Sequence, residues 1–361
     1  MSQKMKGVSR RDSLRWLMLT GGGAILAACG GQETAQSPAA EEPAAEEPAQ
    51  KQPLPAEPKV LEPTSAPAAE QPRVAAHPTD AQEERIPLPA AAGQTYLAVA
   101  RGADPAAITE AALKALGGIE RFVKQGSDVI VKPNICTDYY PYEYGATTNP
   151  QVVAALVRLA LGAGARRVRV MDFPFGGKAE SAYVKSGIEE AVKAAGGEME
   201  LMNRNKFKTT SIPQGKSMKE WEIYQEVLTC DLLIDVGIAK HHSLARMTGA
   251  MKNLLGVVQN RGGVHSIMKD GLGDLLSVIK PGLTVVDAVR TLMRNGPSGG
   301  NLDDVQLNNT VIASQDMVAA DAYAARFLEL SGKDLGYIRS AAERGLGIMD
   351  LETVKVEEIS L

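Results

Sequence analysis

Residues 239–256, AKHHSLARMTGAMKNLLG, gather side chains that can transfer protons and bind anions. His241 and His242 are adjacent in a chain that has only four histidines. Imidazole titrates near working pH, so such a pair suits a general acid and base. Lys252 and Asn253 follow closely, and a lysine charge beside an amide suits an anionic ligand. We therefore predict His241 and His242 as catalytic residues and Lys252 and Asn253 as ligand-binding residues.

The second half of this stretch has the spacing of a helix. Apolar residues in TGAMKNLLGVV recur at intervals that form one buried stripe. Thr248 is the expected N-cap, and a helix start at Gly249 offers unpaired backbone N–H groups to a phosphate or carboxylate. An amphipathic helix with a surface lysine fits the same spacing. The adjacent histidines and Arg246 favour an anion site, to which we assign Thr248 and Gly249.

Strands that alternate with helices must position these residues. One expected helix begins near Asp104, with Pro105 in its first turn, and two others begin at the suitable N-caps Asn149 and Asp316. This alternation predicts an α/β fold, with a mostly parallel twisted sheet and helices on both faces. The expected strands are TYLAVA, DVIVKPN, ARRVRVMDF, EMELMN, DLLIDVG, GLTVVDAV and the edge strand ETVKVEEISL.

Polar residues follow the expected strands at the end where such sheets bind ligands. Ligands of open parallel sheets lie beyond the carboxyl ends of the strands. Lys132 and Asn134 follow one strand, Asp172 a second and the histidine pair a third, while Asp287 ends a fourth. We therefore predict one shared cleft, with Asp172 as a third catalytic residue and Lys132 and Asn134 as further ligand-binding residues.

The segment NGPSGG has the composition of a mobile loop. Asn295, its first residue, is a ligand-binding candidate if the loop covers the cleft or turns toward a phosphate. A plain connector between two elements is an equally good interpretation.

The N-terminus has the layout of a secretory signal peptide. A basic start precedes the apolar run from Leu14 to Ala28. Arg10 and Arg11 resemble the twin-arginine export motif, although Ser13 stands where a large apolar residue is usual. LAAC, which ends at Cys29, resembles a lipobox. Residues 1–29 are therefore predicted to direct export, and a lipidated Cys29 to anchor the protein to a membrane on the periplasmic or extracellular side.

Residues 30–92 are rich in Pro, Ala, Glu and Gln, as in AAEEPAAEEPAQ. Such a segment buries too little apolar surface to offset its ordering entropy, which predicts a disordered tether before an α/β domain at 93–361. The net charge is −4 and only 4% of residues are aromatic, so a nucleic-acid partner is not expected.

Three cysteines limit the redox chemistry. Lipidation of Cys29 would leave Cys136 and Cys230, too few for an iron–sulfur cluster. Cys136 follows the carboxyl end of one expected strand, DVIVKPN, and Cys230 precedes the amino end of another, DLLIDVG. In a parallel sheet these ends lie on opposite edges, so we predict two thiols that are not linked, with Cys136 beside the cleft.

Five segments occur in the order found in a known family: VIVKPN, the helix after TTNP, VRVMDF, AKHHSLARMTGAMKNLLG and IKPGLTVVDAVRTLMRNGPSGG. Over residues 95–325 the chain resembles the bacterial and archaeal domain of unknown function 362 family. The resemblance implies an α/β fold and no established reaction. Many members carry ferredoxin-type cysteine clusters, which this sequence lacks, so no iron–sulfur cluster is expected.

The order His242, Lys252, His265 is also similar to the nickel-pincer lactate racemase family. That resemblance implies proton transfer by His242, a cofactor held by Lys252 and metal ligation by His265. The family has another proton-transfer histidine after an early strand, where this chain reads MDFPFGGK. Racemisation is therefore not expected, whereas a metal or a pincer-like nucleotide cofactor remains one hypothesis.

Two further functions are compatible with the same residues. The first is a tethered enzyme acting on a small anionic molecule, and the second is a ligand-binding or sensing lipoprotein without turnover. Clustered histidines and lysines favour the enzyme.

Overall fold

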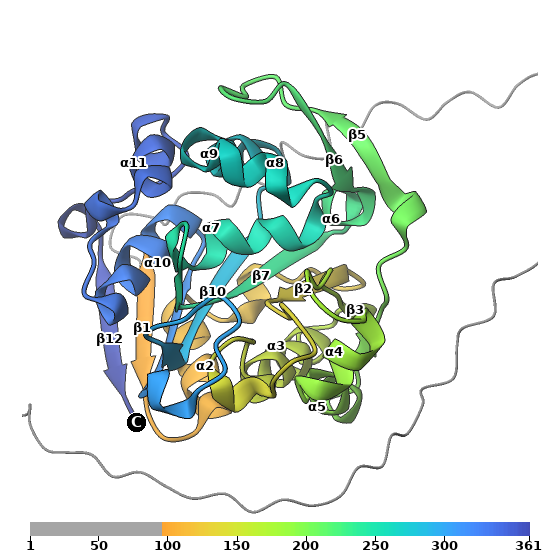
Figure 1. Cartoon of the computed structure of the whole chain (residues 1–361). Coiled ribbons are helices and arrows are strands. Elements are labelled where there is room, and N and C mark those ends of the chain that lie inside the picture. The colour runs from red at the N-terminus through yellow and green to blue at the C-terminus, as the bar shows by residue number, and fades with distance from the viewer. Residues whose placement is uncertain (1–95) are drawn as a thin grey trace, which may run out of the picture. The chain divides into compact units, whose positions relative to one another are not determined.

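The computed structural model describes residues 96–361. Arg10, Arg11, Cys29 and the linker at 30–92 lie outside the described residues. An eight-stranded sheet runs through this part of the chain in the order β12-β1-β11-β10-β7-β2-β3-β4 (Figure 1). Its strands are β1 (Leu97–Arg101), β2 (Asp128–Pro133), β3 (Arg167–Val170), β4 (Glu198–Met199), β7 (Leu232–Ile238), β10 (Leu283–Leu292), β11 (Val305–Ser314) and β12 (Val356–Ser360).

Most neighbouring strands are parallel, which confirms the expected fold class. Only the two pairs made by β11, with β1 and with β10, are antiparallel. β11 is absent from the expected strands, because polar residues such as Asn308 and Asn309 interrupt its alternation of apolar residues. The expected edge strand at the C-terminus is β12, which pairs with β1 alone.

Helices cover both faces of the sheet (Figure 1). On one face lie α2 (Pro105–Ala115), α3 (Pro150–Gly162), α4 (Ala179–Lys185) and α5 (Ile188–Ala194). On the other lie α6 (Gln225–Thr229), α7 (Ala250–Asn253), α8 (Arg261–Ser266), α9 (Met268–Ile279), α10 (Met317–Ala324) and α11 (Gly336–Glu343). Two short hairpins, β5 (Phe207–Ser211) with β6 (Glu220–Tyr224) and β8 (Lys240–His242) with β9 (Arg246–Thr248), complete the fold.

The central strands are apolar on both sides because both sides are covered. In β2, Val129 and Val131 pack with α2, α3 and α5, whereas Ile130 packs with the core on the opposite face. Successive side chains of a strand point to opposite faces, so each face receives alternate residues. This two-sided burial holds the strand ends, and therefore the polar residues after them, in fixed positions.

The predicted helix starts at Asp104, Asn149 and Asp316 are confirmed. Each side chain accepts a hydrogen bond from a backbone N–H in the first turn of α2, α3 or α10. Such a cap typically stabilises a helix by about 1 kcal/mol. Sequence and structure therefore agree on where these three helices begin.

The prediction that Cys136 and Cys230 are not linked is also confirmed within residues 96–361. Cys136 lies after the carboxyl end of β2 and Cys230 before the amino end of β7, and β2 and β7 run parallel. The two thiols are therefore at opposite edges of the sheet.

No helix in residues 96–361 is long and apolar enough to cross a membrane.

Candidate functional site

A buried ion pair joins the carboxyl ends of β2 and β3. Lys132 Nζ lies 2.9 Å from Asp172 Oδ1, and both side chains are almost fully buried. Asp172 Oδ2 accepts a second hydrogen bond from the backbone N–H of Ile135 at 2.7 Å. Both carboxylate oxygens of Asp172 are therefore already engaged, which ties the two strand ends together.

Asn253, at the end of α7, links this ion pair to the neighbouring strand. Its Oδ1 accepts from Lys132 Nζ at 2.9 Å and from Asn134 Nδ2 at 3.0 Å. Its Nδ2 donates to the Lys132 carbonyl and to Asp235 Oδ1 in β7. All the hydrogen-bonding groups of this buried amide are thus used to hold α7 over the strand ends.

Gly256 is required where the chain passes over the ion pair. A Cβ atom at this position would lie 1.9 Å from Asp172 Oδ1 and 2.6 Å from Lys132 Nζ. The backbone can approach the buried charges this closely only without a side chain. The glycine in the NLLG segment therefore belongs to the packing beneath the site.

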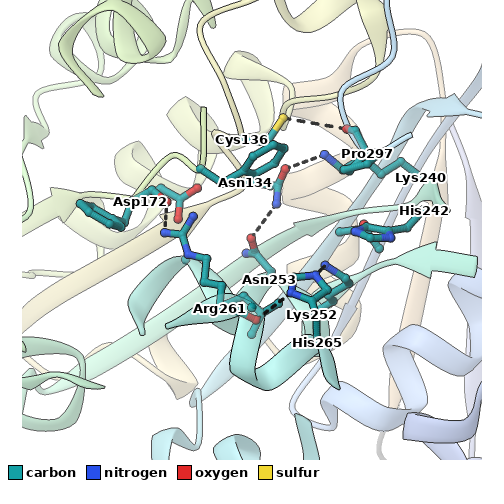
Figure 2. A pocket seen from close by; sticks show the side chains of 16 residues that line it. Asn134, Cys136, Asp172, Lys240, His242, Lys252, Asn253, Arg261, His265 and Pro297 are labelled. Atoms are coloured by element: carbon teal, nitrogen blue, oxygen red, sulfur yellow. Dashed lines mark hydrogen bonds between the residues drawn. The ribbon is translucent and has the colours of Figure 1, made fainter. Parts of the chain in front are cut away.

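A cavity of about 230 Å³ lies above this network (Figure 2). Apolar side chains form part of its wall, among them Phe173, Phe175, Leu255 and Pro297. The polar and ionisable residues that line it are Asn134, Cys136, Asp172, Lys240, His242, Thr248, Lys252, Asn253, Arg261 and His265. Figure 2 shows Lys240 in contact with Asn134 and Lys252 in contact with His265.

Three cationic side chains on this wall have no acidic partner. Within the described part of the chain, Lys240, Lys252 and Arg261 form no ion pair. Lys240 donates to Asn134 Oδ1 and to the Ala146 carbonyl, and Arg261 donates to the Phe173 carbonyl. Burial lowers the pKa of all three groups, because removal from water disfavours a charge. The wall therefore carries three basic groups that no carboxylate of residues 96–361 pairs with.

Lys252 is the most strongly affected of the three. Burial, aided by the nearby charges of Lys240 and Arg261, lowers the pKa of its amine to about 7. Its Nζ lies 3.0 Å from His265 Nε2. A substantial fraction of Lys252 is therefore a neutral amine at neutral pH.

Hydrogen bonds fix the tautomer of His265. Its Nδ1 lies 2.7 Å from the Arg261 carbonyl, which can only accept, so Nδ1 carries the proton. Nε2 is then an acceptor and receives a hydrogen bond from Lys252. Burial and the Lys252 charge lower the pKa of His265, which keeps this ring neutral. The amine thus contacts a neutral imidazole whose orientation is set by a backbone carbonyl.

His242 has the opposite tautomer. Its Nδ1 accepts from the backbone N–H groups of Leu244 and Ala245, so its proton is on Nε2. Burial, with the neighbouring cations, lowers its pKa to about 3. The ring stacks on His265 with centroids 5.8 Å apart. His242 is therefore a neutral hydrogen-bond donor on the cavity wall and a poor base.

The helix start at Gly249 is occupied by a group from the protein itself. Asp321, in α10, accepts from the N–H groups of Ala250 at 2.6 Å and Met251 at 3.0 Å. These two N–H groups are not available to a ligand. The predicted N-cap at Thr248 is wrong, because Thr248 ends β9 and Gly249 takes the cap position. A Cβ at Gly249 would lie 2.1 Å from Asp321, so this glycine makes room for the carboxylate.

Seven predicted site residues line the cavity together, and these are Asn134, Asp172, His242, Thr248, Lys252, Asn253 and His265. Four others do not. Lys132 is buried beneath the floor, and Gly249 packs against Asp321. His241 accepts from the Gly296 N–H outside the cavity, and Asn295 donates to Asp304. The loop that begins at Asn295 reaches the cavity only through Pro297.

Two further expectations differ from the structure. Asp287 is fully buried and accepts from the backbone N–H of Asn149 and Val289, so it positions α3 instead of facing the cleft. Arg246 is exposed and donates to the Asp334 carbonyl, away from the cavity. Cys136 lines the cavity as expected.

Lys240 and Arg261 line the cavity but were given no role in the site assignment from sequence. Lys240 stands with the histidine pair among the ionisable residues at the strand ends, so its position was expected. Arg261 lies at the start of α8, 89 positions after Asp172, and its local sequence NRGG has no distinctive spacing. Only the packing of α8 over the strand ends brings it to the cavity.

Beneath the floor, Asp235 adds a buried carboxyl group. Burial raises its pKa well above the ordinary range, which favours the protonated form. Its Oδ1 accepts from Asn253, whereas its Oδ2 has no partner among the described residues. Asp235 therefore adds little negative charge to offset the cations above it.

The described residues do not build a metal site. Within 96–361, no group of three or more His, Cys, Asp or Glu side chains is placed to hold a metal ion. His265 has both ring nitrogens engaged, with Lys252 and with the Arg261 carbonyl.

Comparison with known proteins gives a family and one curated relative. The family described as domain of unknown function 362 matches residues 129–326. A thylakoid-associated protein of Synechocystis sp. is 28% identical over 245 residues, which cover 65% of this chain and 73% of that protein.

Two solved structures have a weaker likeness. One is a protein from Thermotoga maritima, with a TM-score of 0.39 and 12% identity over 63% of this chain and 60% of that one. The other is the lactate racemase apoprotein from Thermoanaerobacterium thermosaccharolyticum, with a TM-score of 0.41 and 12% identity over 65% of this chain and 57% of that one. In both cases the match spans less than two thirds of the solved chain.

Proposed function

This chain belongs to the domain of unknown function 362 family, and because that description assigns no reaction, we propose a function from the cavity: it binds a small molecule that carries a carboxylate or phosphate group. The observation that carries the proposal is the unpaired positive charge of Lys240, Lys252 and Arg261 around one cavity. An unpaired buried charge is costly, and a bound anion would offset that cost through charge-assisted hydrogen bonds.

Two further features support a ligand of limited size. The volume of about 230 Å³ suits a metabolite with few heavy atoms. Thr248 Oγ1 is buried in the wall and has no hydrogen-bond partner within the described residues. A buried hydroxyl without a partner is uncommon, and a polar ligand atom would satisfy it.

Calorimetric titration of the protein with inorganic phosphate and with oxalate tests the proposal. Lys240→Met and Arg261→Met should each weaken binding about tenfold or more, because a hydrogen bond to a charged group contributes about 1.5–3 kcal/mol. Arg246→Met is the matched control, since Arg246 is an exposed arginine outside the cavity. Equal affinity in all four proteins, or no binding to the unsubstituted protein, would refute the anion site.

A catalytic site and a pure receptor site would use this cavity differently. The neutral amine of Lys252 beside His265 supports catalysis, because a receptor needs only the positive charge. His242→Ala should abolish turnover of a substrate while the affinity for that substrate changes little. If His242→Ala lowers the affinity for the ligand and no turnover is found in either protein, a sensing or transport role is favoured.

A metal in a pincer-like cofactor fits this cavity less well. The nitrogen of His265 that faces the cavity is already bonded to Lys252, and His242 has its proton on the only nitrogen not occupied by backbone N–H groups. Metal analysis of the protein purified from its native export route tests this conclusion. Stoichiometric nickel that disappears in His265→Ala would overturn it.

For location, we propose an exported lipoprotein held at a membrane by Cys29. The support is the sequence at Arg10, Arg11 and Cys29. The name of the thylakoid-associated relative places that protein at a membrane system. Labelling of cells with a palmitate analogue should mark the protein and fail with Cys29→Ser, and Arg10→Lys with Arg11→Lys should block export. A labelled Cys29→Ser variant would rule out this anchor.

A further inference from the structure

Lys252, His265 and the Arg261 carbonyl form a hydrogen-bonded relay at the cavity wall. Lys252 Nζ contacts His265 Nε2 at 3.0 Å, and His265 Nδ1–H donates to the carbonyl at 2.7 Å. A nucleophile in contact with a base that a third group orients is the arrangement of nucleophilic catalysis. Here the nucleophile would be an amine.

The surroundings of Lys252 suit a nucleophile better than a permanent cation. The side chain is buried, no carboxylate pairs with it in the described residues, and Lys240 and Arg261 lie near enough to repel a charge on its amine. Burial next to other cations is a known way to keep a lysine amine neutral and reactive. His265 accepts from the amine, so the amine lone pair is not used as an acceptor.

We propose that Lys252 forms an imine with a small aldehyde or ketone whose carboxylate or phosphate group is bound by Lys240 and Arg261. This inference rests on the proposed anion site and names its substrate class. The anionic group would bring the carbonyl carbon to the amine, and the cavity volume limits the ligand to a small oxo acid or a short phosphorylated aldehyde.

The chemistry balances without another reactant. The Lys252 nitrogen forms a bond to the carbonyl carbon, and the electron pair of the C=O bond moves to oxygen. His265 Nε2 carries the two protons of the amine to this oxygen one after the other. The first turns the alkoxide into a hydroxyl group, and the second allows that hydroxyl group to leave as water. The products are a C=N bond and one water molecule, and no group is oxidised or reduced. His242 Nε2–H is a hydrogen-bond donor on the same wall for the carbonyl oxygen.

Borohydride trapping of the full-length protein tests the proposal. The protein is incubated with pyruvate or glycolaldehyde phosphate, reduced with borohydride and mapped by peptide mass spectrometry. We expect one reduced adduct, on Lys252, that inorganic phosphate suppresses and that is absent in Lys252→Met. Lys193→Met is the control, because Lys193 is an exposed lysine on α5 that pairs with Glu189; labelling of Lys252 should be unchanged in it.

The role of His265 has its own readout. His265→Gln should slow labelling roughly 100-fold, within the range that a positioned base contributes. Imidazole added to the buffer should restore part of the rate, which would not occur if the ring only supported the fold. A variant labelled at the normal rate would remove His265 from the relay.

The outcomes separate this inference from the anion site. If phosphate binds in calorimetry and Lys240→Met weakens it, but Lys252 is labelled no more than Lys193, the imine is refuted and the anion site stands. If neither phosphate binding nor labelling of Lys252 occurs, both proposals fail. Labelling of Lys252 that phosphate does not suppress would refute the anionic substrate class.

Discussion

Lys132 Nζ lies 2.9 Å from Asp172 Oδ1, in a fully enclosed ion pair between residues 40 positions apart in the chain. Lys132 lies near the carboxyl end of β2, and Asp172 lies just after the neighbouring parallel strand β3. The pair therefore fastens the strand ends on which the cavity is built, and Asp172 also lines that cavity.

Removal of one partner of this pair should destabilise the fold strongly. Asp172→Asn leaves the buried Lys132 charge without its carboxylate, and we expect the free energy of unfolding to fall by about 3–5 kcal/mol in urea titrations. The control is Glu189→Gln, which breaks the exposed Glu189–Lys193 pair of α5 and should cost about 0.5 kcal/mol or less. Similar losses in both variants would contradict the structural role of the buried pair.

Asp321 should make stability depend on pH. Burial raises the pKa of this carboxyl to about 7 in the folded protein, above its ordinary value of 3.8. Between about pH 4 and 7 the folded state therefore holds a proton that the unfolded state has lost. Stability should decrease as pH rises through this range, by up to about 1.4 kcal/mol per pH unit for this group.

Urea unfolding at several pH values between 4 and 8 measures this slope. Asp321→Asn should reduce it. A residual slope remains from Asp287, whose pKa burial raises to about 6, and from Asp235 and Asp316, whose pKa values burial also raises. The same slope with and without the substitution would show that Asp321 does not titrate in this range.

Affinity for oxalate should decrease above neutral pH. Below about pH 7 the Lys252 amine is protonated and attracts the anion. Above this pH the amine is neutral and must take up a proton when the anion binds. The affinity therefore falls by up to about tenfold per pH unit. The groups that face Lys252 are Lys240, Arg261, His265, His242 and Cys136. Calorimetry from pH 6 to 8.5 checks the trend, and Lys252→Met should lose the step near pH 7. A step that persists in this variant would assign it to another group.

The two stacked histidines should hold opposite tautomers. Nitrogen-15 spectra of the protein with labelled histidine should show His242 protonated on Nε2 and His265 on Nδ1, with His242→Gln and His265→Gln providing the assignments. Because the pKa of His242 is lowered to about 3, its signals should not move between pH 5 and 8. A His242 signal that titrates near pH 6.5 would contradict the burial and hydrogen bonds described for this ring.

The sequence by itself determined the fold class, most strands, three helix starts and the edge of the sheet where polar residues gather. These features are local, because apolar alternation, capping residues and strand ends can be recognised within a few positions. Asn134, Asp172 and His242 meet at one cavity for this reason: they follow the carboxyl ends of parallel strands, which share an edge.

The tertiary structure decided which polar residues face the cavity and which groups the protein itself satisfies. Asp321, 71 positions from Ala250, fills the helix start that the sequence offered to an anion. Arg261 reaches the cavity because α8 packs over the strand ends, whereas Arg246 turns toward Asp334. The charge state of Lys252 and the tautomer of His265 were also decided by the tertiary structure. The reactivity of Lys252 and the fixed proton of His265 depend on burial and on contacts between distant segments, and these exist only in the folded chain.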